Sequence, residues 1–315
     1  MIIDNMKILI LLSTYNGERY LRNQLDSLYA QEGVDKHLLV RDDGSKDGTL
    51  SILDDYCQHY GHMTIIKGEN VGVRKSFLFL VKEAATHYSE YDYYAFCDQD
   101  DVWFKNKIIT GVNALNECSH AYKLFFSGAI NTDANLQPIS NTCVRIVNSF
   151  GANLVANHIL GCTMLINKVL LLEINKINIC PFDNPSGIIP IHDGWTALVA
   201  YALDAKVIQH KPGMMYYRQH GNNVIGSGNG FWSIQKNRMH RYLSKTTHAK
   251  SNRCIIALQV LGSMIPSKNR QLLELVASYR YSFKAKLRLL FDKRMYEYGL
   301  FDNIGTFFMI LFNKF

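Results

Sequence analysis

The sequence has no apolar run long enough to cross a bilayer, which takes about 20 residues. Its first apolar stretch, residues 8–12, is too short for the core of a signal peptide, and the N-terminus lacks a basic start. Only six prolines and 21 glycines occur in 315 residues, which excludes fibrous and low-complexity proteins. We therefore expect a globular, cytoplasmic protein that meets a membrane only from one side.

The cysteines do not have the pattern of a zinc site or of a disulfide framework. They number seven, an odd count, and no two stand at the spacing of zinc ligands. We expect buried free thiols in a reducing compartment. The seven are Cys57, Cys97, Cys118, Cys143, Cys162, Cys180 and Cys254.

Two common nucleotide-binding loops are also missing. A dinucleotide-binding domain carries Gly-x-Gly-x-x-Gly after its first strand, whereas this chain has Ser-Thr-Tyr-Asn-Gly at 13–17. The loop Gly-x-x-x-x-Gly-Lys-Ser/Thr of the P-loop NTPases does not occur either. Both absences argue against a nicotinamide dehydrogenase and a P-loop NTPase.

Apolar runs and helical periodicity alternate along the first hundred residues. Continuous apolar runs bounded by turn residues predict strands that are buried on both faces, and the stretches between them have the apolar spacing of helices. This alternation predicts right-handed crossovers and a doubly wound, mostly parallel α/β sheet. The predicted strands are 7–13, 37–40, 63–66 and 93–96, with helices at 20–28, 49–60 and 76–86.

The later pattern is less regular. Apolar runs predict further strands, and the spacing of apolar residues predicts two further helices, of which the second opens from a loop at 188–195. The predicted strands are 123–129, 159–166 and 206–210, the helices are 105–118 and 196–201, and 131–149 is expected to be irregular.

Polar turns follow three of the predicted strands, at 13–17, 42–45 and 98–101. Because parallel strands end at one edge of a sheet, these turns are expected to meet there and to bind a ligand. The third turn holds Asp98, Asp100 and Asp101, whose mutual repulsion is costly unless a cation lies among them. This favours an Mg2+ or Mn2+ site that brings a diphosphate. The alternative, a solvated turn that caps the next helix, stays open for Asp101.

The charge divides the chain in two. Residues 231–315 contain 15 Lys and Arg against 4 Asp and Glu, a net charge of +11, whereas the other 230 residues carry 19 and 23, a net −4. We predict a main domain at 1–230 and a basic, amphipathic helical region at 231–315. Such a region suits an anionic membrane surface, and the alternative is a helical appendage packed on the main domain. No nucleic-acid motif occurs, so we expect no nucleic-acid partner.

Six motifs in order carry a resemblance over about 7–226. Together they resemble family 2 glycosyltransferases of the GT-A fold, and within them the bacterial rhamnosyltransferases of surface-polysaccharide assembly. The motifs are Ser-Thr-Tyr-Asn-Gly (13–17), Arg-Asp-Asp-Gly-Ser-Lys-Asp (41–47), Asn-Val-Gly-Val (70–73), Cys-Asp-Gln-Asp-Asp-Val-Trp (97–103), His-Asp-Gly-Trp (192–195) and Tyr-Arg-Gln-His-Gly-Asn-Asn (217–223).

The resemblance implies a site for a nucleotide-sugar donor. A carboxylate would accept the imide N–H of uracil or thymine, and an aromatic ring would stack on the base. The residues placed around the nucleoside and diphosphate are Thr14, Tyr15, Asp42, Asp43, and Arg74 or Lys75.

It also implies a divalent cation, Mn2+ or Mg2+. Asp98 and Asp100 resemble the family's Asp-x-Asp pair, in which one carboxylate reaches the sugar and ribose while the other holds the cation. Asp101 extends this pair, and the sequence leaves open which two of the three ligate. His220, beside Arg218, resembles the late basic motif that meets the diphosphate or completes the metal shell.

Asp193 resembles the general base of an inverting transfer, which deprotonates the acceptor hydroxyl as that hydroxyl attacks the anomeric carbon. The alternative for this residue alone is a helix cap. His192 would tune the base or simply pack. Trp103 and Trp195 would stack on a sugar or fill the core. Gly194 departs from the bulkier residue that we expect in the sub-group, which would alter the acceptor side.

We therefore expect an inverting, metal-dependent glycosyltransferase. It would move rhamnose from dTDP-rhamnose, or a hexose from a UDP-sugar, onto a lipid-linked glycan at the inner membrane face, in bacterial O-antigen, capsule or cell-wall synthesis. Two alternatives stay open. One is a non-catalytic, membrane-docked scaffold of a polysaccharide assembly complex. The other is a nucleotidyltransferase, which would need a basic, glycine-rich loop after the first strand.

Overall fold

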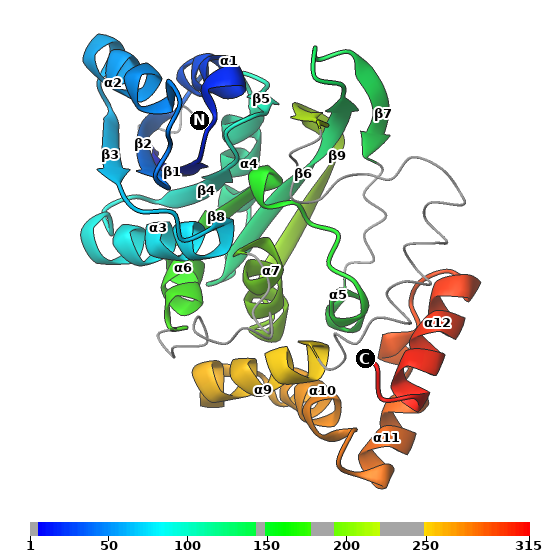
Figure 1. The fold of residues 1–315 in the computed structure, drawn as a ribbon. Helices are drawn as coiled ribbons and strands as arrows, with labels where there is room; N and C mark the ends of the chain where they lie inside the picture. The colour runs from blue at the N-terminus through cyan, green and yellow to red at the C-terminus, as the bar shows by residue number, and fades with distance from the viewer. Residues whose placement is uncertain (1–5, 143–148, 178–191, 221–248) are drawn as a thin grey trace.

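The computed structural model describes residues 6–142, 149–177, 192–220 and 249–315. In this part of the chain the strands form one nine-stranded sheet in the order β3-β2-β1-β4-β8-β6-β9-β5, with β7 paired to β6 (Figure 1). The strands are β1 (Lys7–Thr14), β2 (Asp35–Asp42), β3 (Met63–Lys67), β4 (Tyr93–Cys97), β5 (Val102–Trp103), β6 (Lys123–Thr132), β7 (Pro138–Thr142), β8 (Met164–Asn167) and β9 (Lys206–Arg218).

The first half of the sheet is parallel, as the sequence predicts. β1 lies between β2 and β4, and β3 pairs with β2, all in one direction. Residues 8–12 of β1 are fully buried, since helices cover both faces of the sheet. The predicted strands at 7–13, 37–40, 63–66 and 93–96 are confirmed, each a little longer than expected.

The second half is mixed. β8 runs antiparallel between β4 and β6, so β6 and β9 point the same way as β1. Three predictions fail here. The irregular segment predicted at 131–149 contains β7, and β9 continues to Arg218 through a register shift instead of ending at 210. The strand predicted at 159–166 begins only at Met164, because residues 161–163 form a short 3-10 turn, η1 (Gly161–Thr163).

Helices cover both faces of the sheet (Figure 1). Helices α1, α2 and α4 bury their apolar side chains on one face, whereas α3, α6 and α7 pack on the other. Their bounds are α1 (Glu18–Tyr29), α2 (Thr49–Tyr60), α3 (Val73–His87), α4 (Lys107–Asn116), α5 (Phe150–Val155), α6 (Lys168–Asn175) and α7 (His192–Ala202). α7 already includes His192 and Asp193, which the sequence places in a loop.

The C-terminal region is helical and shares the core of the main domain. α9 packs against α7 and α10, and the Asn269 side-chain amide on α10 donates to the Tyr201 and Ala202 carbonyls at 3.0 and 3.2 Å. At the chain end, Phe315 is buried against Tyr279. The elements are α9 (Ala249–Leu261), η3 (Gly262–Met264), α10 (Ser267–Ser278), α11 (Phe283–Leu290), η4 (Lys293–Met295) and α12 (Leu300–Leu311).

The predicted domain boundary at 230/231 lies outside the described residues and stays a prediction. None of the helices that the structure describes is both long and apolar enough to span a bilayer.

The shared core leads to a stability prediction. Leu273 on α10 is fully buried in the cluster that also contains α7, so Leu273→Ala should lower the free energy of unfolding by about 2–5 kcal/mol. Leu287→Ala on the exposed side of α11 is the matched control, and it should cost less than about 1 kcal/mol. Urea unfolding monitored by circular dichroism measures both. Equal, small losses would show that the C-terminal helices form a separate unit.

Candidate active site

The topology brings the predicted site residues to one edge of the sheet. β1, β2, β4 and β9 run in the same direction, so the segments after Thr14, Asp42, Cys97 and Arg218 all leave from that edge. β8 runs the other way, so η1 before it lies there too. α7 ends just before β9 begins, which places its first turn, with Asp193, toward the same edge.

The turn after β1 is tied to both of its neighbours. Gln99 accepts from the Tyr15 N–H at 2.8 Å and donates to the Tyr15 carbonyl at 3.1 Å, and Asn16 N–H donates to Ser45 at 2.9 Å. A Cβ at Gly17 would meet the end of the Gln99 side chain, which would have to shift and give up its contact with Tyr15. Thr14 is buried, whereas the Tyr15 side chain is 45% exposed and its ring is open to a stacking partner.

Asp42 and Asp43 are buried and engaged within the protein. Asp42 accepts from Thr14 and from the N–H groups of Gly44 and Ser45, in addition to the Ser45 hydroxyl. Asp43 pairs with Arg41 and accepts from the N–H groups of the turn before α3, at Val71 and Gly72. Both carboxylates therefore shape the edge of the proposed base pocket. Direct contact of either with a base stays a prediction.

The acidic turn after β4 is held by the end of β9. Asp101 accepts from the Arg218 N–H at 3.2 Å, and the Arg218 guanidinium donates to the Asp100 carbonyl at 2.8 Å. Asp100 contacts His220, with 2.7 Å between Oδ2 and Nε2. The alternative of a helix cap at Asp101 is wrong, because α4 begins at Lys107 and its N-cap is Asn106. Arg218 is buried and contacts the turn itself.

Two carboxylates of this turn form a cluster of possible metal ligands with a cysteine from η1. In the described part of the chain, the carboxylates of Asp98 and Asp101 and the Cys162 thiol have ligand atoms within 4.8 Å of one another. Asp101 Oδ2 is buried, and no group in the described part of the chain forms a hydrogen bond with it. A desolvated carboxylate oxygen of this kind fits a cation. The acidic turn and His220 thus fit a divalent metal by donor type.

Burial and mutual repulsion control the charge of this group. Burial, together with the charges of Asp100 and Asp193, raises the pKa of Asp98 to about 7, against the opposing effect of a hydrogen bond from Cys162. Burial also raises the pKa of Asp101, together with the charges of Asp100 and Asp98. The charge of Asp193 thus acts on Asp98, in keeping with the start of α7 at the same edge of the sheet as the acidic turn.

Asp193 is partly buried in the first turn of α7. Burial raises the pKa of its carboxyl group to about 6, while a hydrogen bond from the Gly194 N–H and the charge of Arg253 favour the ionised form. The carboxylate is therefore mostly ionised at neutral pH and titrates close to it, which suits a general base. Its catalytic role stays a prediction.

The three aromatic side chains singled out in the sequence, His192, Trp195 and Trp103, pack in the core. His192 lies between Phe77 and Phe96, with ring centroids 3.7 and 4.8 Å away, and burial lowers its pKa to about 3, so the ring is neutral. Trp195 is buried and donates to the Ile174 carbonyl. Trp103 is buried under the Lys107 ammonium group. The sugar-stacking alternative for the two tryptophans is therefore wrong.

The structure adds residues that the sequence does not single out. Cys162 and Lys107 lie beside the acidic turn, and the charge of Arg253 on α9 acts on Asp193. A lone cysteine and single basic residues in a basic region give no local signal. The cysteines that the structure describes are free, as expected, while Cys143 and Cys180 lie outside the described residues.

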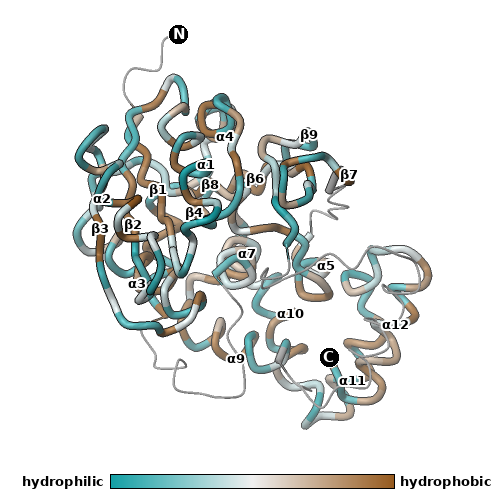
Figure 2. Tube along the Cα trace, turned by 45° about the horizontal axis from the view of Figure 1, so that its top comes forward, coloured by the Kyte–Doolittle hydropathy of each residue, from teal (hydrophilic) through white to brown (hydrophobic). Residues whose placement is uncertain are grey.

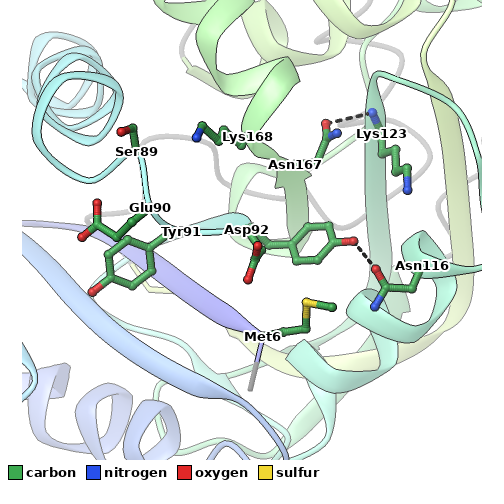
Figure 3. A pocket seen from close by; sticks show the side chains of 10 residues that line it. Met6, Ser89, Glu90, Tyr91, Asp92, Asn116, Lys123, Asn167 and Lys168 are labelled. Atoms are coloured by element: carbon green, nitrogen blue, oxygen red, sulfur yellow. Dashed lines mark hydrogen bonds between the residues drawn. The ribbon is translucent and has the colours of Figure 1, made fainter. Parts of the chain in front are cut away.

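A separate polar hollow of about 310 Å³ lies at the opposite edge, around residues that precede β1 and β4 (Figure 3). Asp92 there accepts from the Lys7 N–H, Tyr93 donates to Asn116, and Asn167 accepts from the Lys123 N–H. These bonds hold the strand ends together. Because ligands of such sheets bind at the carboxyl ends of the strands, the hollow is not part of the candidate site.

Comparison with known proteins gives concordant results. Residues 9–167 match the family model described as Glycosyl transferase family 2. The dTDP-rhamnosyl transferase RfbG of Shigella flexneri is 32% identical over 230 residues, which cover 70% of this chain and 75% of RfbG. An uncharacterised glycosyltransferase of Rickettsia typhi, RT0329, is 27% identical over 175 residues, about half of either chain.

Two solved structures show the same fold. TarS of S. aureus, in complex with UDP-GlcNAc, superposes with a TM-score of 0.55 at 15% identity over 97% of this chain and 90% of that one. The mannosyltransferase PcManGT of Pyrobaculum calidifontis, in complex with GDP-Man and Mn2+, gives 0.51 at 15% identity over 100% and 89%. The predicted GT-A fold with a helical C-terminal region is confirmed.

The raised carboxyl pKa values predict how pH and metal act on stability. Carboxyl groups whose pKa is higher in the folded state lose their stabilising effect as pH rises through about 6 to 7. In a chelator, the melting temperature should therefore be lower at pH 8 than at pH 5.5. Mn2+ should raise it more at pH 8, because a cation replaces the lost protons.

Calorimetric melting at the two pH values, with EDTA or Mn2+, tests this. Asp98→Asn should weaken both the pH dependence and the metal effect, whereas Asp54→Asn on the exposed side of α2 should leave them unchanged. A metal effect of the same size at both pH values would contradict the prediction.

Proposed function

Because the chain belongs to glycosyl transferase family 2, we propose that it is an inverting, metal-dependent rhamnosyltransferase that uses dTDP-rhamnose and a lipid-linked glycan acceptor. The identity of 32% with a dTDP-rhamnosyl transferase, over most of both chains, is the observation that carries this choice of donor. A UDP-sugar is the second donor candidate. Membership of the family sets aside the scaffold and nucleotidyltransferase alternatives.

In the proposed reaction Asp193 is the general base. Its carboxylate accepts the proton of the acceptor hydroxyl, the hydroxyl oxygen forms the new bond to the anomeric carbon, and the bond to the nucleoside diphosphate breaks. The Gly194 N–H holds one carboxylate oxygen in place. Asp193 stands in the first turn of α7, at the same edge of the sheet as the acidic turn, where the donor's anomeric carbon would have to lie.

The donor would lie along the edge formed by the turns after β1 and β2. Tyr15 offers an exposed ring to the base, and Thr14 with Asp42 and Asp43 fixes the shape of this pocket. Arg218 positions the acidic turn, and His220, which contacts Asp100 there, is the proposed contact to the diphosphate. Arg74, in the first turn of α3, is proposed to approach the base or the diphosphate.

The proposed ligands of Mn2+ or Mg2+ are Asp98, Asp100, Asp101 and His220. Asp100 and His220 are both partly exposed and therefore reachable by a diphosphate, whereas Asp101 is enclosed. When bound, the cation neutralises the charge that develops on the leaving nucleoside diphosphate. PcManGT, a neighbour in fold, is complexed with Mn2+, which supports this proposal.

The proposed membrane contact is the apolar face of α11 and α12, where hydrophobic residues colour the helices brown in Figure 2. Phe283, Phe291 and Phe301 are 76–80% exposed, and Lys284 and Arg288 are exposed between them. Exposed aromatic side chains with interspersed cations suit the surface of an anionic bilayer. The face comprises Tyr281, Phe283, Leu287, Phe291, Leu300, Phe301, Ile304, Phe308, Leu311 and Phe312.

The enzymatic proposal predicts a defined defect for Asp193→Asn. With Mn2+, dTDP-rhamnose and a lipid-linked acceptor, kcat should fall by about 10²–10⁴, because the amide cannot accept the proton, while the Kd for dTDP should stay within about twofold. In the wild type, kcat/KM should fall as pH drops below about 6, where Asp193 becomes protonated.

A panel of UDP-, GDP- and dTDP-sugars serves as the donor control. Faster turnover with a UDP-sugar than with dTDP-rhamnose would identify the UDP-sugar as the donor and leave the proposed class of reaction unchanged. An unchanged kcat in Asp193→Asn would show that Asp193 is not the general base.

The membrane proposal predicts that Phe283→Glu with Phe301→Glu lowers binding to anionic vesicles by about tenfold or more, because two exposed aromatic anchors are lost. Ile139→Glu, which changes an exposed apolar residue on β7, is the matched control and should bind like the wild type. Sedimentation with phosphatidylglycerol vesicles measures the binding. A wild-type protein that stays in the supernatant would refute the membrane contact.

A further inference from the structure

One aromatic ring on α1 contacts both basic residues at the end of β9. The Arg218 guanidinium lies over the ring of Tyr20, with its central carbon 4.4 Å from the ring centroid. The imidazole ring of His220 packs on the same side chain, with 4.9 Å between the two ring centroids and 31° between their planes. Asn23, one turn farther along α1, accepts from the Arg218 guanidinium at 3.4 Å. A cation over an aromatic face is held by electrostatic attraction as well as by packing, so Tyr20 restrains the two residues that hold the acidic turn.

Both of these contacts lead on to Asp100. The Arg218 guanidinium donates to the Asp100 carbonyl at 2.8 Å, and His220 Nε2 lies 2.7 Å from Asp100 Oδ2. An imidazole that turned about its side-chain bonds would carry Nε2 away from this carboxylate, and packing against Tyr20 restricts such turning. Tyr20 therefore acts on Asp100 through Arg218 and His220.

The helix that carries Tyr20 is tied to the turns on either side of it. At its start, the Glu18 carboxylate accepts from the Gly48 N–H at 2.9 Å, in the segment that follows β2. Near its end, the Ser27 hydroxyl accepts at 3.0 Å from the N–H of Trp103, which lies just after the acidic turn. Tyr20 is therefore held in a fixed place relative to both segments.

The hydroxyl group of Tyr20 takes no part in these contacts. It is enclosed, and no group in the described ranges of the chain forms a hydrogen bond with it. An enclosed hydroxyl that is not hydrogen-bonded adds nothing favourable to the folded state. The ring alone therefore makes the contacts to Arg218 and His220, and a phenylalanine would keep them.

We propose that Tyr20 is a positioning residue for the cation and the diphosphate of the donor, an inference that rests on the proposed function. Its ring holds Arg218 and His220 against the acidic turn, and these two residues hold Asp100 in place as a ligand. Because α1 begins directly after the turn at 13–17, where the base is proposed to bind, one helix supports both ends of the donor site.

The test compares Tyr20→Leu, which removes the ring, with Tyr20→Phe, which keeps it. Electron paramagnetic resonance measures Mn2+ binding in the presence of dTDP, or of UDP where UDP binds the wild type more tightly. Tyr20→Leu should raise the Kd for Mn2+ by about tenfold or more, because it frees a side chain that orients a ligand. Tyr20→Phe should bind within about twofold of the wild type. Tyr29→Leu, the matched control, removes a ring of α1 that stacks on Tyr60 at 4.4 Å and should also stay within about twofold.

Two further measurements separate positioning from a general loss of structure. In Tyr20→Leu the KM for the donor should rise, while the KM for the acceptor should stay within about twofold. In a His220→Ala background, Tyr20→Leu should raise the Kd for Mn2+ by a smaller factor than in the wild type, because the contact through His220 is already lost. Should Tyr20→Leu fail to fold, Tyr20→Met takes its place in each assay.

Equal losses in Tyr20→Phe and Tyr20→Leu would give the hydroxyl a direct role and overturn the proposal. An undiminished effect in the His220→Ala background would overturn it as well, because the ring would then not act through His220. A wild type that binds no Mn2+ with either nucleotide would remove the cation site and this proposal with it.

The positioning role and the proposed function fail in different ways. If the wild type transfers no sugar from any donor, the proposed function fails, while the Mn2+ titration still decides for or against Tyr20. If the wild type is active and Tyr20→Leu binds Mn2+ and the donor equally well, only the positioning proposal fails.

Discussion

Three carboxylates crowd into one turn at the end of β4, and holding them there is the constraint on which the rest of the structure depends. Asp98 and Asp101 repel each other in a desolvated place, so their pKa values rise. The groups that hold the turn, Arg218 and His220, come from the end of β9, more than a hundred residues away. Because β9 must run parallel to β4 to deliver them to the same edge, the long mixed sheet and the site arise from one requirement.

The sequence predicts the parallel half of this sheet well and the mixed half poorly, for a physical reason. β1 is a continuous apolar run because helices cover both of its faces, and such a run is visible without knowledge of its neighbours. β9 passes through Lys211, Pro212 and Gly213, where the register with β6 shifts, so its pattern breaks although the pairing continues. β8 begins later than predicted, after a 3-10 turn whose Gly161 packs closely against His192, a tertiary contact that the local sequence pattern does not reveal.

The sequence likewise predicts only part of the candidate site. Each polar turn follows a strand that the sequence predicts, so its position at the carboxyl edge of the sheet can be deduced. The sequence also places Asp193 near the start of a helix, where the structure has it. Roles that depend on tertiary partners could not be deduced. The carboxylate oxygens of Asp42 accept hydrogen bonds from its own turn, and the Trp195 indole N–H donates to a backbone carbonyl in the core. In the sequence Arg253 is one of many basic residues. Only the packing of α9 against α7 shows that its charge acts on Asp193.

The C-terminal helices show why net charge alone misleads about such a region. Its excess of Lys and Arg suggests a detachable tail, yet α9 and α10 share the core of the main domain. The exposed aromatic residues are concentrated farther along, on α11 and α12. On the proposed function, the apolar face of α11 and α12 meets the bilayer that holds the lipid of the acceptor. Because α7 and the C-terminal helices contribute to one core, the membrane surface and the base would keep a fixed distance from each other.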